Sequence, residues 1–490
     1  MTAASGRSGS GLESADHAEG WAADGVPTEA PAQVAGAALP WRSLFFCLPL
    51  LLAPLLVWWL AFFPALSTAD SVNSWDQIRT GHWDSHHPPP FTGLFWLFTR
   101  FTDSPWVMSL AQSIAMAAAL AVFAVILSRR FSAGWWPVVA AFALVALPWL
   151  GPFTQEIWKD VPSAVALVVL SAALILATSD TGDRPGLPAW GWTAVVAAAA
   201  LSAGLLRWNG AGTVVVAGVL AAPALSRGLR VRGVLACVFG GLLGFGVIMG
   251  LPSVSAVKPI PSVERHATFY ADLANVARTN SHDLTPSDVA ALEAVAPLAD
   301  WAHAGRKCFW INDSYYRFIA RHDARAVESA NPALMTTWYQ LLGTHPLDIV
   351  RPRVCRASAA LPWIPPQHRG YRTFTVVTQQ ALTPGAKPPL PWLHALGSRA
   401  LSYFTMAPMV WGAWMPAWWF LLFGAAAAFR WRGLGRRLLV LCLAVPVGTV
   451  VSYVVSAQSN DARYNLPAII ILLPLTAAVV GRRAGPPPGT

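Results

Sequence analysis

The sequence predicts an α-helical polytopic membrane protein with about ten transmembrane helices. The chain of 490 residues is 55% hydrophobic and only 12% charged, with a mean hydropathy of +0.47, whereas a soluble domain carries about 25% charged residues. Apolar runs of roughly 20 residues recur along it, which is the length that crosses a bilayer core of about 30 Å. Arginines gather in short connections between these runs, as the positive-inside rule describes.

The apolar runs and the arginines together give the order and orientation of the predicted spans. With the amino terminus inside, the even-numbered connections and the stretch after the last span carry most of the arginines, which places both termini in the cytoplasm of a multi-pass plasma-membrane protein. The runs lie near 43–65, 105–127, 135–153, 161–178, 189–206, 211–226, 233–251, 399–428, 438–457 and 466–481, and the inner arginines are Arg129, Arg130, Arg184, Arg227, Arg230, Arg232, Arg430, Arg432, Arg436, Arg437, Arg482 and Arg483.

Composition divides the chain into five parts. The first is rich in Ala, Gly, Ser and Pro without apolar periodicity, which predicts a disordered cytoplasmic tail and not a signal peptide. The third lies outside between spans 7 and 8 and predicts an extracytoplasmic domain or loop, with a helix near 285–296 that has Thr285 as N-cap and Pro286 as its first residue. The parts are 1–40, 41–251 with spans 1–7 and the first outer loop at 66–104, 252–398, 399–481 with spans 8–10, and a cytoplasmic tail at 482–490.

The net charge of +10 does not indicate a nucleic-acid partner. The arginines follow the topology, and the sequence shows neither zinc-finger spacing nor a glycine-rich phosphate loop. Of five cysteines, Cys308 and Cys355 lie in the third part, where an oxidising compartment permits a disulfide. Two buried free thiols are the alternative.

The first outer loop, which includes TADSVNSWDQIRTGHWDSHHPPPFTG (68–93), gathers ionisable groups directly after the first span. Its three prolines cannot continue a helix and predict an extended turn that orients the histidines. Its Trp residues are typical of the membrane interface, where partial desolvation raises the pKa of a carboxylate toward that of a general base. A solvated loop is one alternative; a divalent metal site is another, although no His-x-x-x-His or Cys-pair spacing supports it. The candidates are Asp70, Asp76, Asp84, His86 and His87.

Three further connections place polar groups on the same membrane face. At the start of the fourth span, Lys159 fits a phosphate ligand, or else pairs with its acidic neighbour at a helix start. Arg207 lies so close to hydrocarbon that it needs a partner, unless it snorkels to the interface. Lys and Arg supply a cradle for an anion such as the phosphate of a lipid. The candidate binding residues are Lys159, Asp160, Arg207, Asn209, Arg463 and Tyr464.

With these motifs the chain resembles the GT-C superfamily of membrane glycosyltransferases. Within the superfamily it is similar to a group of bacterial, in particular actinobacterial, proteins. The resemblance covers about residues 43–480 in layout and rests on ADSVNSWDQIRTGHWDSHHPP, WKDVPSA, LRWNG, WYQLLGTHPLDIVRPR and ARYNLP. It implies transfer of a sugar from a polyprenyl-phosphate-linked lipid donor to a glycan, lipid or protein acceptor of the cell envelope. It also implies an active site in the first outer loop, with Asp70 as the acceptor-activating base.

The sequence departs from the superfamily pattern at the base. It has no Asp-x-Asp or Glu-x-Asp pair in this loop, so Asp76 and Asp84 remain alternatives to Asp70, and metal dependence stays open. A lipid phosphate leaves once its charge is held, for which Lys159, Arg207 and Arg463 are the candidates. One-step displacement predicts inversion at the anomeric carbon.

Two other classes of protein compete with the transferase. A multi-pass transporter or lipid flippase places ionisable residues near the bilayer midplane and uses broken helices or inverted repeats, whereas the charges here gather at one face. A scaffolding membrane protein would use the 252–398 segment to recruit a partner and would tolerate Asp70→Asn.

Overall fold

The computed structural model describes residues 39–148, 150–177, 188–306, 311–360, 382–383, 385–406, 416–429, 435–458 and 462–482. Within these ranges the chain is helical, and its β-type contacts are two isolated bridges, Leu66 with Glu156 and Asp84 with Lys258. The predicted tail at 1–40 falls almost wholly outside the described residues, as does most of 482–490.

The predicted apolar runs correspond to helices. Within the described part, five helices are long and apolar enough to cross a membrane: α1 (Leu44–Ala61) with the 3-10 turn before it, α4 (Trp106–Phe131), α8 (Ala189–Leu206), α10 (Arg227–Val254) and α20 (Arg436–Ser456). Shorter apolar helices coincide with the other runs: α5 (Trp136–Ala146), α7 (Asp160–Leu176), α9 (Gly210–Ala221), α19 (Pro416–Phe429) and α21 (Leu466–Val480). The prediction of an α-helical polytopic membrane protein is confirmed.

Two predicted spans differ from the observed helices. The run at 135–153 is interrupted: α5 ends at Ala146 and the short α6 (Leu150–Gln155) follows. The reason is Pro148, because the residue before a proline avoids helical geometry and Leu147 is extended. The run at 399–428 covers the end of α17 (Pro391–Met406) and α19, with residues 407–415 outside the described ranges.

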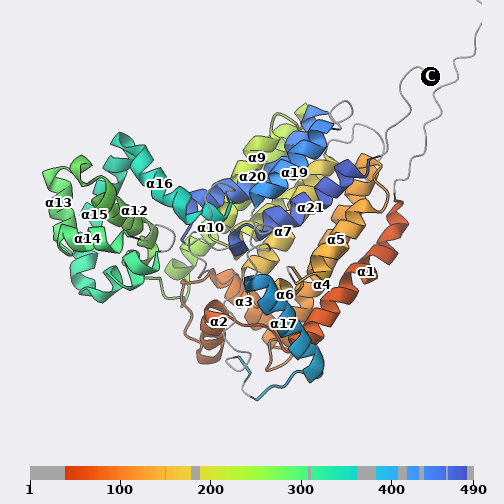
Figure 1. The fold of residues 1–490 in the computed structure, drawn as a ribbon, viewed down its shortest axis with the longest axis horizontal. Coiled ribbons are helices and arrows are strands. Elements are labelled where there is room, and N and C mark those ends of the chain that lie inside the picture. Colours follow the sequence, from red (N-terminus) through yellow and green to blue (C-terminus); the bar gives the residue numbers. More distant parts are fainter. Residues whose placement is uncertain are drawn as a thin grey trace, which may run out of the picture. The chain divides into compact units, whose positions relative to one another are not determined.

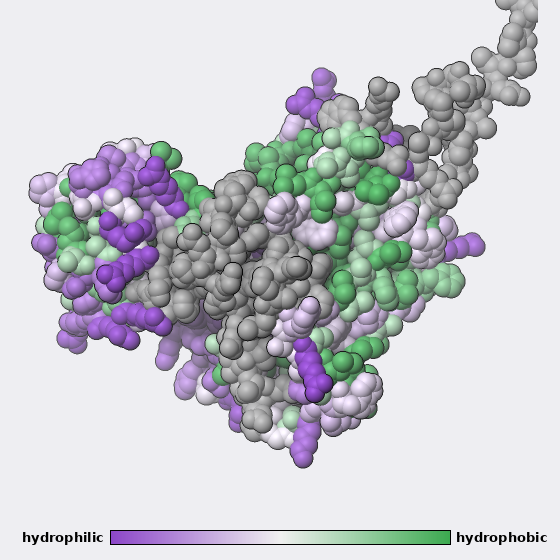
Figure 2. All heavy atoms as spheres, viewed as in Figure 1, coloured by the Kyte–Doolittle hydropathy of each residue, from purple (hydrophilic) through white to green (hydrophobic). Residues whose placement is uncertain are grey.

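The helices pack into one apolar bundle, in which α21 lies against α4, α5, α7 and α20 (Figure 1). One close approach joins α8 to α10, where a Cβ added to Gly204 would meet the carbonyl oxygen of Gly241 at 2.8 Å. Small residues at such contacts let membrane helices approach closely. Figure 2 shows hydrophobic residues over the surface of the bundle, where Leu421 and Leu422 of α19 are more than half exposed. An exposed apolar surface of this extent fits a lipid environment.

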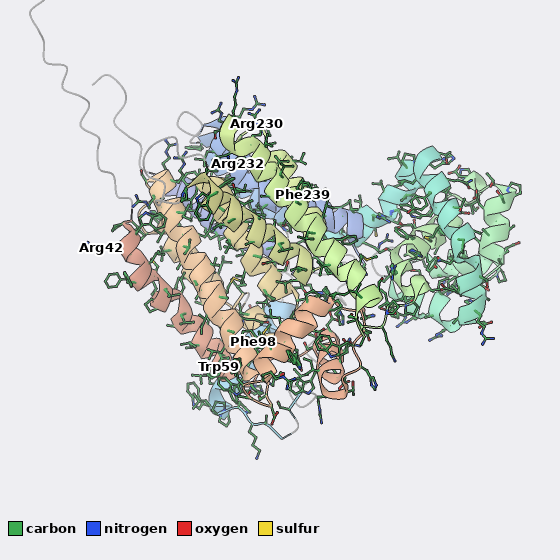
Figure 3. The ribbon with its side chains drawn as sticks, turned by 180° about the vertical axis from the view of Figure 1, so that it is seen from behind. Arg42, Trp59, Phe98, Arg230, Arg232 and Phe239 are labelled. Atoms are coloured by element: carbon green, nitrogen blue, oxygen red, sulfur yellow. The ribbon has the colours of Figure 1, made fainter. Side chains whose placement is uncertain are left out.

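The two ends of the bundle differ in composition. Arg42 precedes α1, and Arg230 and Arg232 lie in the first turns of α10; Figure 3 shows all three at one end. Trp59 and Phe98 lie toward the other end (Figure 3). The arginine-rich end is the one that the sequence predicts to be cytoplasmic, and this sidedness stays a prediction.

The first predicted loop contains two helices, α2 (Ala69–Thr80) and α3 (Pro89–Thr99). Thr68 caps α2 by accepting a hydrogen bond from the amide of Ser71, and Gly81, with φ +71°, ends the helix in the left-handed conformation that glycine permits. The prolines do not form an extended turn as predicted: Pro88 is the residue before α3, and Pro89 and Pro90 are its first two residues. A proline lacks the amide hydrogen that the first turn of a helix does not need.

Residues 255–360, named here the helical insert, contain a further group of helices, and the 3-10 helix η8 (Ala462–Tyr464) precedes α21. The predicted helix near 285–296 is confirmed as α13, with the Thr285 cap and Pro286 as its first residue. The insert has its own hydrophobic cluster around Tyr270, Leu292 and Trp301, while the predicted domain boundaries stay predictions. Its elements are α11 (Ser262–Arg265), α12 (Ala267–Thr279), η2 (Ser281–Asp283), α13 (Pro286–Glu293), α14 (Leu298–Ala304), η3 (Asn312–Tyr316), η4 (Ile319–Arg321), α15 (Ala324–Thr344), α16 (Pro346–Arg356) and η5 (Ser358–Ala360).

Candidate active site

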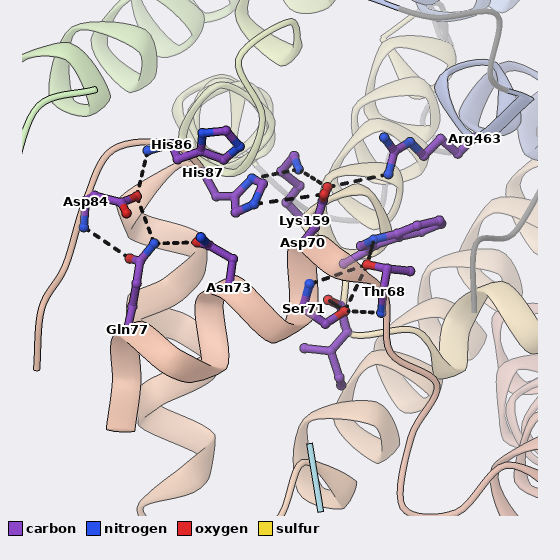
Figure 4. Close-up of polar contacts among 12 residues, drawn as sticks. Thr68, Asp70, Ser71, Asn73, Gln77, Asp84, His86, His87, Lys159 and Arg463 are labelled. Atoms are coloured by element: carbon purple, nitrogen blue, oxygen red, sulfur yellow. Dashed lines mark hydrogen bonds and ion pairs between the residues drawn. The ribbon is translucent and has the colours of Figure 1, made fainter. Parts of the chain in front are cut away.

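Asp70 lies at the centre of a charged cluster at the start of α2. Its Oδ2 accepts a hydrogen bond from Lys159 Nζ at 2.7 Å and lies 3.5 Å from Arg463 Nη1 (Figure 4). The side chains of Asp70, Lys159 and Arg463 are 26%, 15% and 17% exposed, so a ligand can reach all three. Segments 89 and 393 residues apart along the chain thus meet at one carboxylate.

His87 completes this cluster. Its Nδ1 lies 3.2 Å from Lys159 Nζ, and its Nε2 lies 4.0 Å from Asp70 Oδ1. Burial, together with the positive charge of Lys159, holds the pKa of His87 well below its usual range. Because an ammonium only donates, Nδ1 accepts from Lys159, and the neutral imidazole carries its proton on Nε2. His87 therefore orients Lys159 and presents an N–H toward Asp70.

The pKa of Asp70 differs from the sequence-based expectation. Burial raises it, but the positive charges of Lys159 and Arg463 outweigh burial and hold the pKa well below its ordinary value. The predicted rise of the Asp70 pKa toward the range of a general base is therefore wrong for the protein without a ligand, because two cations face the carboxylate.

A second ion pair lies next to the cluster. Arg207 Nη2 is 2.7 Å from Asp160 Oδ1, and both side chains are buried, at 6% and 1% exposure. The Arg207 guanidinium lies over the Tyr464 ring at 4.7 Å, and the Arg463 guanidinium contacts the same ring at 5.2 Å. Tyr464 thus joins the buried pair to the exposed cluster, and Arg207 has the partner that its position requires.

Side-chain hydrogen bonds fix the start of α2 against the start of α7. Ser71 Oγ donates to the carbonyl of Ile157 at 2.9 Å, and Trp158 Nε1 donates to Thr68 Oγ1. The Trp158 ring in turn receives the Arg463 guanidinium at 4.7 Å. Asp70 and Lys159 face one another because the segments on either side of them are held together.

The remaining predicted residues lie apart from this cluster. Asp76 is exposed on α2. Asp84 accepts hydrogen bonds from Gln77 Nε2 at 2.8 Å and from the amide of His86 at 2.9 Å, so it holds the loop (Figure 4). The backbone carbonyl of Asn209 accepts from Ser452 Oγ at 2.6 Å.

Sequence reasoning missed the contribution of the helical insert. His86 Nδ1 lies 2.7 Å from Glu264 Oε1, and this hydrogen bond raises the pKa of His86. The backbone of Lys258 forms an isolated β-bridge with the backbone of Asp84. Glu264 belongs to none of the motifs that the sequence analysis identified, and nothing around it indicates a partner 178 residues earlier. Cys308 lies outside the described residues, so its pairing with Cys355 stays a prediction.

The residues around Asp70 do not fit a divalent metal. Two cations and a neutral histidine that points an N–H at the carboxylate would oppose a second positive ion there. Within the described ranges, the groups close enough to share a metal ion are Asp283, His345 and Asp348 of the insert. The Asn280 amide donates to both of these carboxylates, at 3.3 and 2.6 Å.

No protein-family model and no curated protein matches the chain. Among solved structures, the chain is similar to ArnT from Cupriavidus metallidurans bound to undecaprenyl phosphate, with 14% identity over 89% of this chain and 78% of that chain. The TM-score is 0.34. At this identity and TM-score, the likeness assigns neither a family nor an activity to this chain.

Proposed function

We propose that the protein is a membrane glycosyltransferase of the GT-C type, which moves a sugar from a polyprenyl-phosphate-linked donor to a cell-envelope acceptor on the extracytoplasmic face. The observation that carries the proposal is the Asp70 carboxylate between the cations of Lys159 and Arg463 beside an apolar bundle. The carboxylate supplies a base for an acceptor hydroxyl, and the cations supply ligands for a departing phosphate. The sequence motifs point to the same class of reaction.

The partly exposed cations and the buried cation have different roles in this proposal. Lys159 and Arg463 are partly exposed and sit at the carboxylate, so they are the phosphate ligands. Arg207 is already paired with buried Asp160, so its part is to hold Tyr464 beside Arg463. A long apolar tail on the phosphate would lie along the exposed apolar surface of the bundle.

The chemistry is a single displacement. The acceptor oxygen forms a bond to the anomeric carbon of the donor sugar while its proton passes to Asp70. The bond between the anomeric carbon and the phosphate oxygen breaks, and its electron pair stays on the phosphate beside Lys159 and Arg463. Attack from the face opposite the phosphate inverts the anomeric configuration, and retention in the product would overturn the one-step version.

Donor binding changes the strength of the base. Without a donor, Lys159 and Arg463 hold the pKa of Asp70 low, although burial opposes them. A bound phosphate adds negative charge beside the same cations and so offsets their effect on Asp70. The pKa of Asp70 therefore rises when the donor binds, and Asp70 becomes a better base in the complex than in the free protein.

Native mass spectrometry of the gently purified protein tests the proposal. Wild type is compared with Lys159→Ala, Arg463→Ala and the matched control Arg79→Ala, which removes an exposed positive charge from the same loop. We expect a polyprenyl phosphate or its sugar adduct on wild type and on the control, and its loss from the two cluster variants. Absence of this lipid from well-folded wild type, even after its addition, would contradict the proposal and favour the transporter.

A further inference from the structure

Asp272 of α12 is a fully buried carboxylate that takes no part in the proposed chemistry. Its Oδ2 accepts hydrogen bonds from Trp338 Nε1 at 3.0 Å and from Arg353 Nε at 2.9 Å, and its Oδ1 pairs with Arg356 Nη2. A buried charge is costly unless it is paired and hydrogen-bonded. Asp272 therefore fixes the position of two arginines on α16.

The same two arginines hold the end of α20. Arg356 Nε donates to the carbonyl of Ala457 at 3.0 Å, and Arg353 Nη1 donates to that of Val455. Tyr453 Oη donates back to the carbonyl of Arg356 at 3.2 Å. Carbonyls at a helix end have no partner within the helix, and cations are favourable there. The helical insert thus clamps the end of α20.

This clamp continues into the candidate active site. The Tyr453 ring stacks on the Tyr464 ring, with centroids 5.1 Å apart and planes 22° apart. Tyr464 contacts Arg463, whose guanidinium faces Asp70. We infer that Asp272 is a positioning residue, which acts through the arginines of α16 and through Tyr453 to hold Arg463 at the phosphate site. Its effect on catalysis rests on the proposed function, whereas its effect on the order of this segment does not.

The experiment compares full-length wild type with Asp272→Asn, which keeps the shape but removes the charge, and with Asp300→Asn, an exposed acid of the same insert. In Asp272→Asn, exchange of backbone amide hydrogens should become about tenfold faster at residues 453–458 and 462–468, while the exchange rates in α13 and α15 stay unchanged. The kcat/KM for a polyprenyl-phosphate sugar should fall about tenfold and its acid limb should move to higher pH, because Arg463 holds the phosphate and lowers the pKa of Asp70. Asp300→Asn should match wild type.

A second variant covers the outcome in which Asp272→Asn does not fold. Tyr453→Leu removes the ring stack but leaves the Asp272 hydrogen bonds, and it should give the same fall in kcat/KM and faster exchange at 462–468 with α12 unchanged. Unchanged exchange at 462–468 in both variants overturns the inference, as does loss of protection throughout the insert in Tyr453→Leu. If wild type neither binds nor uses the lipid, the proposed function fails, and the exchange result alone decides the inference.

Discussion

Replacing Lys159 with alanine removes the nearest cation from both Asp70 and the phosphate that we propose binds beside it. Lys159 Nζ and Asp70 Oδ2 are 2.7 Å apart, and the two side chains are 15% and 26% exposed. At that distance the attraction is roughly 6 kcal/mol at an effective dielectric constant of 20 and about 1.5 kcal/mol in bulk water. Removing one preorganised ligand of a developing anion costs about 10²–10³-fold in rate. We therefore expect kcat/KM to fall by about 10²–10³-fold.

The same variant moves the pH profile in a direction that the structure fixes. Asp70 acts as a base only when ionised, so activity is present above its pKa and is lost as pH falls through it. Lys159 is the charge that most lowers this pKa, although burial is the larger influence and raises it. Without Lys159 the pKa of Asp70 rises, and the acid limb of kcat/KM moves to higher pH. In wild type, the acid limb of kcat should also lie at higher pH than that of kcat/KM. The reason is that a bound phosphate offsets the charges of the cations that lower the pKa of Asp70.

The assay is transfer of a labelled sugar from a polyprenyl-phosphate donor to an acceptor by purified protein, between about pH 3 and about pH 8, a range that includes the ordinary pKa values of carboxyl and imidazole groups, about 3.9 and about 6.5. Arg79→Ala should keep the wild-type rate and profile, and Lys159→Arg should recover part of the rate. A large loss of rate in Lys159→Ala with an unmoved acid limb would refute Asp70 as the titrating base.

Three further predictions separate the parts of the site. Asp70→Asn should lower kcat by about 10²–10⁴-fold in the transfer assay, while Asp76→Asn stays at the wild-type rate because that side chain is exposed; equal losses would place the base elsewhere. Transfer should persist in EDTA, since the charges at Asp70 oppose a dication, and a loss restored by one added divalent ion would contradict this. Thr68→Ala removes the cap of α2, so the free energy of unfolding should fall by about 0.5–2 kcal/mol in denaturant titrations, with an unchanged midpoint as the contrary result.

The helices could be predicted because their signal is local. A run of apolar residues about 20 long identifies a span wherever its neighbours pack, and the cap of α13 stands in adjacent residues, Thr285 to Asp288. The break before Pro148 was also present in the sequence but was outweighed by the apolar run around it. That Asp70 and Asp76 face different sides of one helix could have been predicted too. They are six residues apart on a helix capped at Thr68, so their side chains point about 120° apart and cannot both face one site.

The electrostatics of Asp70 could not be predicted in the same way, because two opposing effects act on one carboxylate. Burial raises its pKa and nearby cations lower it, and the outcome depends on distances of 2.7 and 3.5 Å to residues 89 and 393 positions away. Sequence composition gave the burial but not these distances. The same reasoning applies to Glu264 and Asp272, whose partners come from tertiary packing alone. In the proposed reaction, the protein sets the charge balance of the free site, and a bound phosphate would change that balance by competing with Asp70 for Lys159 and Arg463.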